Sequence, residues 1–187
     1  MAKDKDKCSY GDFLAMIGLC HKDHQKELID ILEHQDCPKF LCGREVPADL
    51  NKISYGQLDD LQTSVNSEDP FYETCHILLG IEKKELMDED VNNVFGFVRF
   101  VVREVERINK IFSSIKPSYS PEERAAGVET LSFGSFGVLD WYARRMHIAN
   151  QNEVRDIAWV RIYQCMKNDN EQNEYERRLS KVYQNKK

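Results

Sequence analysis

The residues with the clearest chemical potential are cysteines and histidines near the start of the chain. Six of them fall between positions 20 and 42: Cys20, His21, His24, His34, Cys37 and Cys42. Thiolate and imidazole groups are the ligands that zinc prefers in proteins. On a helix Cys20 and His24 would share one face, and His34 with Cys37 could supply a second pair. The sequence therefore permits a small zinc-stabilised binding or regulatory module in which Cys20, His24, Cys37 and Cys42 hold one metal ion. His21 or His34 could replace one of these ligands.

Other features of this segment favour ordinary packing over metal binding. It contains no Cys-x-x-Cys pair, and Cys37 directly precedes Pro38, where a helix would stop. Core cysteines and surface histidines explain the same composition without a ligand. We therefore expect no cofactor, with zinc as the alternative.

The remaining reactive residues do not suggest a catalytic arrangement. Cys75 and His76 are adjacent, and on a helix adjacent side chains point about 100° apart, too far for a nucleophile to hydrogen-bond its base. Acidic clusters at 59–60 and 88–90 lie at helix starts or on polar faces, where the helix dipole explains them. The Gly-x-x-Gly sequence at 134–137 lacks the lysine of a phosphate-binding loop. We therefore expect a protein that is not an enzyme.

The composition indicates a folded protein with a mixed-charge surface. Of 187 residues, 41% are hydrophobic and 31% are charged, and the net charge is −6 with acids and bases interspersed. Such a chain can bury a core, and it offers no single basic surface to a nucleic acid. We therefore expect the partners to be proteins and not nucleic acids.

The N-terminus shares some features with a lipoprotein signal. Lys3, Lys5 and Lys7 precede an apolar stretch that ends at Cys20. However, acids interrupt the basic region, the apolar stretch is short, and Leu19 is too large for the position before a lipidated cysteine. No other apolar run approaches the length of a membrane span. We therefore expect a cytoplasmic protein with no membrane partner, whose cysteines stay reduced.

The strongest periodic pattern lies between Val91 and Ile115 and predicts a long helix. Apolar residues recur there at alternating spacings of four and three: Val94, Val98, Val101, Val105, Ile108, Phe112 and Ile115. This heptad pattern is typical of a helix with one continuous apolar face. Four more apolar residues widen that face: Phe95, Phe97, Phe100 and Val102. Such a helix must be covered on several sides.

Capping residues, prolines and glycines predict the elements around this helix. Ser54 and the pair Asp69–Pro70 are typical helix starts, and Gly80 is a typical helix end. The segment 39–47 predicts a short β-hairpin or extended arm that turns at Cys42–Gly43.

Together these patterns predict a mainly α protein: a helical domain around one long apolar helix, with a short β-hairpin or arm and a C-terminal helical pair. The long helix is expected to follow a start at Asp88, and the C-terminal pair to cover about 136–147 and to resume near Asn150. The expected organisation has four parts: an N-terminal helical segment at 1–36, a central core at 37–116, a Pro-containing hinge at 117–130, and a C-terminal unit with a polar tail at 131–187.

A short phrase recurs three times along the chain, at Ser9-Tyr10-Gly11, Ser54-Tyr55-Gly56 and Ser132-Phe133-Gly134. The residues around the three copies do not match. We therefore interpret them as three independent helix starts and not as an internal repeat.

Two stretches of the sequence resemble the helical tail-assembly chaperones of long-tailed bacteriophages. The first is 46–62, in which Tyr55-Gly56-Gln57 is similar to the phrase that opens the helical core of several such proteins. The second combines Gly137 to Ala143, Asn152 to Val154 and the charged segment from Tyr163 to Tyr183, and is similar to the C-terminal extension of the longer forms. The resemblance covers about residues 40–187.

This resemblance implies a non-enzymatic assembly chaperone in the cytoplasm of a bacterial host. Its partner would be a phage tail protein or another virion protein, whose aggregation-prone surface it covers before polymerisation. The wide apolar helix suits docking of such a client or self-association into a homo-oligomer. The expected partner-binding residues are Phe95, Phe97, Phe100, Val102, Trp141, Tyr142 and Trp159. Core packing is the alternative role for each of them.

Overall fold

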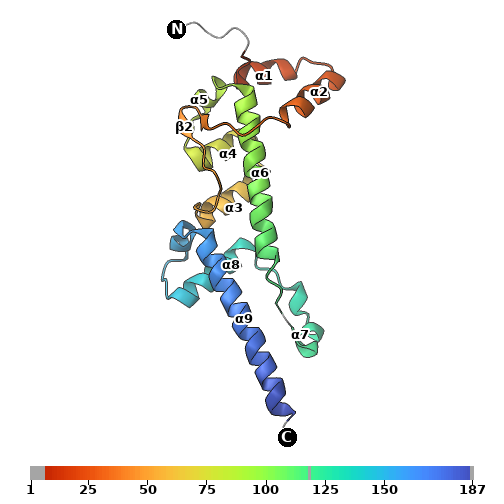
Figure 1. The fold of residues 1–187 in the computed structure, drawn as a ribbon, viewed down its shortest axis with the longest axis vertical. Helices are drawn as coiled ribbons and strands as arrows, with labels where there is room; N and C mark the ends of the chain where they lie inside the picture. Colours follow the sequence, from red (N-terminus) through yellow and green to blue (C-terminus); the bar gives the residue numbers. More distant parts are fainter. Residues whose placement is uncertain (1–6, 118, 186–187) are drawn as a thin grey trace. The chain divides into compact units, whose positions relative to one another are not determined.

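A computed structural model describes residues 7–117 and 119–185, and it is mainly α-helical with one small antiparallel hairpin (Figure 1). The mainly α class and the short hairpin expected from the sequence are confirmed. Residues 1–6 of the expected N-terminal segment and Ser118 of the expected hinge lie outside the described residues. The elements in chain order are α1 (Tyr10–Ile17), α2 (Lys22–Leu32), β1 (Phe40–Leu41), β2 (Arg44–Glu45), α3 (Tyr55–Ser64), α4 (Pro70–Leu79), α5 (Lys83–Met87), α6 (Val91–Ser113), α7 (Pro121–Ala125), the 3-10 helix η1 (Val128–Thr130), α8 (Gly134–Met146), the 3-10 helix η2 (Gln151–Asp156) and α9 (Trp159–Gln184).

The chain divides into two compact units, each of which combines segments that are distant in sequence. Among the described residues, the first unit comprises 7–50 and 60–106, and the second comprises 51–59, 107–117 and 119–185. The division passes through α3 and α6. In the second unit, the segment around Ser54 packs with residues just before α9.

An aromatic cluster forms the core of the first unit. Phe95 on α6 lies at its centre, with its ring centroid 4.7 Å from that of Phe71 on α4 and 5.4 Å from that of Phe13 on α1. Tyr10 stacks on Phe71 at 6.1 Å. These contacts fasten α1 and α4 to α6, and aromatic pairs of this kind add stability beyond the area they bury.

A second aromatic cluster lies in the core of the other unit. Phe112 at the end of α6 contacts Trp159 and Tyr163 at the start of α9, with ring centroids 5.9 and 5.6 Å apart. Tyr142 on α8 is 1% exposed and Ile162 on α9 is fully buried. Phe112, Trp159 and Tyr163 therefore hold the end of α6 against the first turns of α9, and Tyr142 and Ile162 are buried in the same unit.

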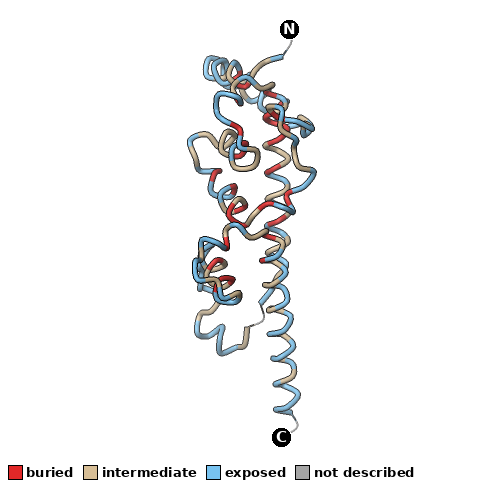
Figure 2. Tube along the Cα trace, turned by 90° about the vertical axis from the view of Figure 1, so that its left-hand side faces the viewer, coloured by how far each residue is buried: buried red, intermediate tan, exposed pale blue. Residues whose placement is uncertain are grey.

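The heptad pattern of α6 corresponds to a covered face, as the sequence predicted. Val94, Val101 and Ile108, which are seven residues apart, are at most 2% exposed. Val98 and Val105, which alternate with them, are half-buried. Figure 2 shows the buried positions recurring along the helix. The helix ends at Ser113, two residues before the expected end at Ile115.

The β-hairpin turns at the two residues that the sequence indicated. Leu41 pairs with Arg44, and the turn residues Cys42 and Gly43 both have positive φ angles, of 47° and 73°. A two-residue turn with this geometry matches the natural twist of antiparallel strands. Leu41 is fully buried and anchors the hairpin in the first unit.

The connection between α2 and the hairpin crosses α6 at Gly96. A Cβ atom on Gly96 would overlap the carbonyl oxygen of Asp36 and lie 2.8 Å from its carbonyl carbon. The Arg99 guanidinium, one turn later, donates a hydrogen bond to the Gln35 carbonyl at 3.3 Å. Only glycine therefore allows the two backbones to approach so closely.

The predicted helix caps at Ser54, Asp69 and Gly80 are confirmed. The Ser54 hydroxyl accepts a hydrogen bond from the Gln57 N–H at 3.1 Å, and the Gln57 side chain accepts one from the Ser54 N–H at 3.1 Å. Asp69 caps the N–H of Tyr72, and Gly80 ends α4 with a left-handed φ of 60°. These local signals act over a few residues, which is why the sequence alone identifies them.

Two element boundaries differ from the sequence prediction. The helix start expected at Asp88 is instead the end of the short helix α5, and α6 begins at Val91, the first residue of the predicted long helix. After α8, the chain forms the 3-10 helix η2 from Gln151, and α9 begins only at Trp159. The Asn150 side chain caps η2 through the Asn152 N–H at 3.1 Å. The predicted capping position is therefore real, but the helix that it starts is a short 3-10 helix.

The phrases Ser9-Tyr10-Gly11 and Ser54-Tyr55-Gly56 both open a helix with the same backbone arrangement. The residue after each serine donates its N–H across an antiparallel bridge, Tyr10 to the Glu89 carbonyl and Tyr55 to the Ile157 carbonyl, both at 2.8 Å. The serines form the bridges Ser9↔Asp90 and Ser54↔Ala158. In each case the bridge immediately precedes a long helix, α6 or α9.

The two glycines of these phrases occupy matching positions as well. A Cβ atom would lie 3.0 Å from the Met87 carbonyl oxygen at Gly11 and 2.9 Å from the Arg155 carbonyl oxygen at Gly56. The two phrases are helix starts, as interpreted from the sequence, and they share a local backbone arrangement that the sequence analysis did not predict. Gly134 differs from them, since α8 begins at this residue and not before it.

Candidate functional site

The cysteines and histidines near the N-terminus are spread over separate elements of the first unit. Cys20 follows α1, His24 is exposed on α2, Cys37 is exposed in the connection to the hairpin, and Cys42 is in the hairpin turn. Within residues 7–117 and 119–185, no three His, Cys, Asp or Glu side chains are grouped as ligands for a metal ion. The structure therefore does not bring together the four ligands of the zinc alternative.

The two histidines that could replace a zinc ligand have local contacts. His21 lies 3.4 Å from the Asp23 carboxylate, and the Nδ1 atom of His34 lies 2.7 Å from the Asp30 carbonyl oxygen. All six cysteines are free thiols. Both histidine contacts therefore join residues that are close in sequence.

Cys75 and Cys42 are protected thiols in the first unit. Burial raises the pKa of Cys75 to about 12, and burial together with the nearby Glu89 carboxylate raises the pKa of Cys42 to about 12. The Cys42 thiol also lies 3.6 Å from the Glu85 carbonyl oxygen, to which it donates a hydrogen bond. Since the thiolate is the nucleophile, both thiols are unsuited to covalent catalysis near neutral pH. His76 is exposed and its ring bonds the Ile81 carbonyl, so the pair Cys75–His76 has a structural role.

We expect Cys75 to resist alkylation in the folded protein. Cys75 is fully buried, and its raised pKa leaves almost no thiolate at pH 8. Iodoacetamide treatment followed by peptide mass spectrometry should label the exposed Cys37 first and Cys75 only after denaturation in guanidinium chloride. Equal labelling of the two cysteines in native buffer would contradict the described packing.

The Glu89 carboxylate holds the hairpin turn against the start of α6. It accepts hydrogen bonds from the Cys42 N–H at 2.7 Å, the Asn93 side chain at 2.9 Å and the Asp90 N–H at 3.1 Å. Burial alone would raise the pKa of Glu89, but these hydrogen bonds lower it below its ordinary value. Glu89 therefore links the hairpin turn to the start of α6. The sequence alone does not indicate this role, because there Glu89 is one of three consecutive acidic residues.

Replacing Glu89 with glutamine should destabilise the protein by about 1–2 kcal/mol, because an amide can present only one oxygen where the carboxylate accepts three donors. A carboxyl group with a lowered folded-state pKa stabilises the protein above its unfolded-state pKa, and that stability is lost as the pH falls. Urea unfolding at a series of pH values should show the stability of the wild type decreasing as the pH falls below 4.5, the ordinary pKa of a glutamate side chain. The Glu89→Gln variant should show a smaller decrease, whereas an identical decrease in both proteins would contradict this role.

Most of the residues expected to bind a partner lie in the core. Phe95, Phe97, Tyr142 and Trp159 are all below 10% exposed. Phe100 and Trp141 are half-buried, and Val102 is 50% exposed. The four buried residues therefore pack in the core of this structure, which is the alternative role given for them above. The same apolar pattern in the sequence suits core packing and partner binding equally well.

Exposed large apolar side chains gather instead in three segments of the described chain. One set lies on α1, on α2 and between them (Leu14, Met16, Leu19, Leu28, Ile29 and Ile31). A second leads into α8 (Leu131, Phe133 and Phe136), and a third lies near the end of α9 (Tyr175, Val182 and Tyr183). The sequence analysis did not single out these segments. The available signal was a short apolar stripe on an otherwise charged helix.

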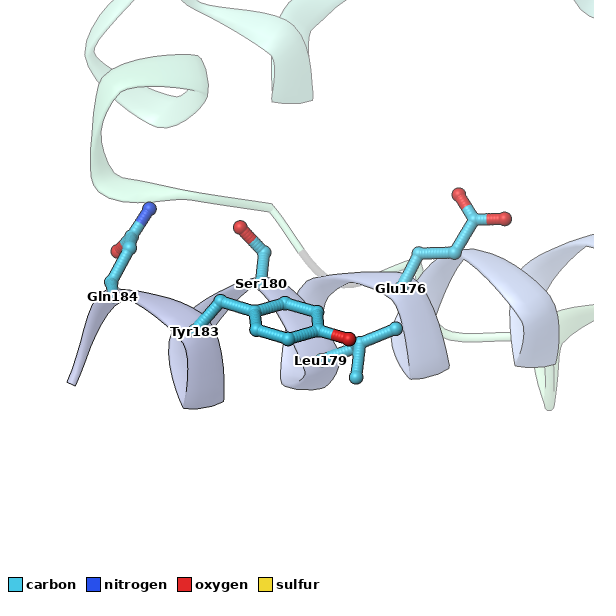
Figure 3. Close-up of a pocket in the computed structure, with 5 residues that line it drawn as sticks. All are labelled: Glu176, Leu179, Ser180, Tyr183 and Gln184. Atoms are coloured by element: carbon cyan, nitrogen blue, oxygen red, sulfur yellow. The ribbon is translucent and has the colours of Figure 1, made fainter. Parts of the chain in front are cut away.

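A shallow hollow of about 360 Å³ lies along the last turns of α9. Figure 3 shows its lining residues on successive turns of this one helix: Glu176, Leu179, Ser180, Tyr183 and Gln184. They include one carboxylate and no histidine, cysteine or basic side chain. The hollow therefore offers a small apolar contact area with a polar rim, without a nucleophile and base pair.

No helix in the described part of the chain is both long and apolar enough to cross a membrane. Comparisons with protein-family models, with curated proteins and with solved structures gave no match.

Proposed function

We propose that this protein is a non-enzymatic assembly chaperone of a bacteriophage tail, or a related phage morphogenesis protein, acting through protein–protein contacts. The observation that carries the proposal is the set of large apolar side chains outside the core, on α1, α2 and the segment before α8. Leu19 is 89% exposed and Phe133 is 70% exposed. Exposed apolar side chains of this kind suit the transient covering of an apolar client surface.

The resemblance to tail-assembly chaperones supports the same proposal. Its most distinctive phrase, Tyr55-Gly56-Gln57, lies at the first turn of α3. Gly56 allows the close approach of Arg155, whose guanidinium pairs with Asp59 at 2.9 Å and donates to the Gly56 carbonyl at 3.3 Å. The phrase therefore has a structural role in the second unit.

The test is co-expression of the full chain with tail-tube and tape-measure proteins, followed by measurement of each client in the soluble fraction. We expect at least one of them to become more soluble and to purify with the chain. A variant with Leu131, Phe133 and Phe136 changed to serine probes the residues around the start of α8, because these exposed side chains contribute little to the core. Failure of the wild-type chain to bind or solubilise any of these clients would contradict the proposal.

A further inference from the structure

The helix α2 is fixed at both ends, although few of its side chains are buried. At its start, the Gln25 side chain donates hydrogen bonds to the Ile17 carbonyl at 2.7 Å and the Cys20 carbonyl at 3.0 Å. At its end, Leu32 is 6% exposed. The residues that follow are held against α6 by the close approach at Gly96. A helix fixed in this way is preorganised, so a partner that binds it does not need to order it first.

Between these fixed ends, α2 presents an apolar stripe to solvent. Ile31 is 60% exposed, Leu28 is 40% exposed and Ile29 is 38% exposed. In Figure 2 the residues of α1 and α2, near the N-terminus, are largely pale blue, in contrast to the buried positions of α6. Leu28 and Ile31 are three residues apart, which places them on adjacent turns of one helix face. This is the arrangement that recognises a second helix.

The charges beside this stripe are acidic, and they form no ion pair with a basic residue in the described ranges 7–117 and 119–185. Glu27, Asp30 and Glu33 are exposed, and none of them forms an ion pair with a residue whose placement the structure describes. The basic residues of α2, Lys22 and Lys26, lie in its first half. The second half, which carries the apolar stripe, is therefore a negatively charged surface.

From this combination we propose that α2 is a docking surface for an amphipathic helix whose apolar face is bordered by lysine or arginine. Apolar contact with Leu28 and Ile31 would supply affinity, and the acids would select a basic border. A second copy of this chain fits less well, because a symmetric pair of α2 helices centred on Leu28 and Ile31 would bring the two copies of Asp30 close together. This inference rests on the proposed function only in assuming a protein partner, and it specifies the chemistry of that partner.

The test uses the full chain and a synthetic peptide of about 18 residues, with leucines at helical spacing and lysines beside them. We expect binding in calorimetry that weakens as the salt concentration rises, because salt screens exposed charges. A peptide with glutamate in place of each lysine should bind at least about tenfold more weakly, since it faces like charges. Equal binding of the two peptides, or binding of neither, would overturn the proposal.

Matched variants locate the site on α2. Ile31→Glu should weaken binding of the lysine peptide at least about tenfold, whereas Val65→Glu, which places the same charge at a residue 70% exposed elsewhere in the first unit, should not. Reversing Glu27 and Asp30 to lysine should also weaken binding, with Glu45→Lys and Glu68→Lys as the control pair. Circular dichroism checks that each variant folds, and equal binding of Ile31→Glu and wild type would overturn the proposal.

Two further outcomes separate this inference from the proposed function. If a tail protein is solubilised equally by wild type and Ile31→Glu, the assembly function stands but α2 is not its docking surface. If the peptide binds through α2 and no tail protein is solubilised, the docking surface stands and the proposed function fails. Sedimentation of a wild-type dimer that Ile31→Glu dissociates would assign α2 to a second copy and overturn the proposal.

Discussion

Replacing Gly96 with alanine is expected to lower the free energy of unfolding by about 3 kcal/mol or to prevent folding of the first unit. The added Cβ atom would overlap the Asp36 carbonyl oxygen and lie 2.8 Å from the carbonyl carbon. Both atoms belong to the backbone, so no side-chain rotation can relieve the clash, and the connection must move away from α6. Overpacking of this kind usually costs about 1–3 kcal/mol, and rigid surroundings place Gly96 at the upper end.

The control for this change is Gly18→Ala. Gly18 ends α1 with a φ of −67°, and a Cβ atom there would meet no atom within 4 Å. Alanine is compatible with that conformation, so the free energy of unfolding should change by less than about 0.5 kcal/mol. Urea unfolding of the two variants measures the difference. Equal stabilities would show that the connection does not pass against Gly96 as described.

Displacement of the connection should also affect α2, because the carbonyls of Gln35 and Asp36 fix the residues that follow this helix. If Gly96→Ala still folds, it should bind the lysine peptide more weakly than wild type, although Gly96 is not part of the proposed surface. Gly18→Ala should bind as wild type does. This comparison separates the position of α2 from the chemistry of its side chains.

The sequence was most informative about features that depend on neighbouring residues. The caps at Ser54 and Asp69, the hairpin turn at Cys42–Gly43 and the helix end at Gly80 all follow from local hydrogen bonding or backbone preference. The long helix also follows, because its heptad pattern extends over several turns. Each of these signals is contained within the element that it defines.

Features that depend on distant residues were not predictable in the same way. Nothing near Gly96 indicates that Asp36 crosses it, and nothing near Glu89 indicates that it receives the N–H of Cys42. The backbone arrangement shared by Ser9 and Ser54 was not predicted, because the surrounding side chains differ. The matching hydrogen bonds are made by the backbone, which places few demands on residue type.

The apolar pattern of α6 does not by itself separate a binding surface from a core. A wide apolar pattern such as that of Phe95 and Phe97 suits a buried helix and a binding helix equally well, and only the positions of its neighbours decide between them. The shorter stripe on α2 is weaker in the sequence, since it has fewer apolar residues. It is nevertheless exposed, because no other described element covers Ile31, which is 60% exposed.

The second large effect is expected at Val101, where aspartate should destabilise the protein by about 3–5 kcal/mol, because it buries a carboxylate with no partner. Val101 is 2% exposed and is the middle one of the three buried residues Val94, Val101 and Ile108 on α6. If this variant fails to fold, Val101→Ala provides a milder test, with an expected loss of about 2 kcal/mol from lost contacts and an unfilled cavity.

Neighbouring positions on the same helix supply graded controls. Val105 is half-buried, so Val105→Asp should have a smaller effect than Val101→Asp. Val102 is 50% exposed, and Val102→Asp should change the free energy of unfolding by less than about 1 kcal/mol. Urea unfolding of the three variants at pH 7 measures the order of their stability losses. A larger loss for Val102→Asp than for Val101→Asp would place a different face of α6 in the core.

The pH dependence of Val101→Asp distinguishes a buried charge from simple loss of packing. Burial raises the pKa of an aspartate above its unfolded-state value, so the variant must either bury a charge or take up a proton when it folds. Its destabilisation relative to wild type should therefore be largest at pH 7 and decrease as the pH falls toward about 4. The loss in Val101→Ala should not decrease in this way, because alanine does not titrate. Parallel pH profiles for the two variants would show that the aspartate reaches water, and that this face of α6 is less covered than the structure describes.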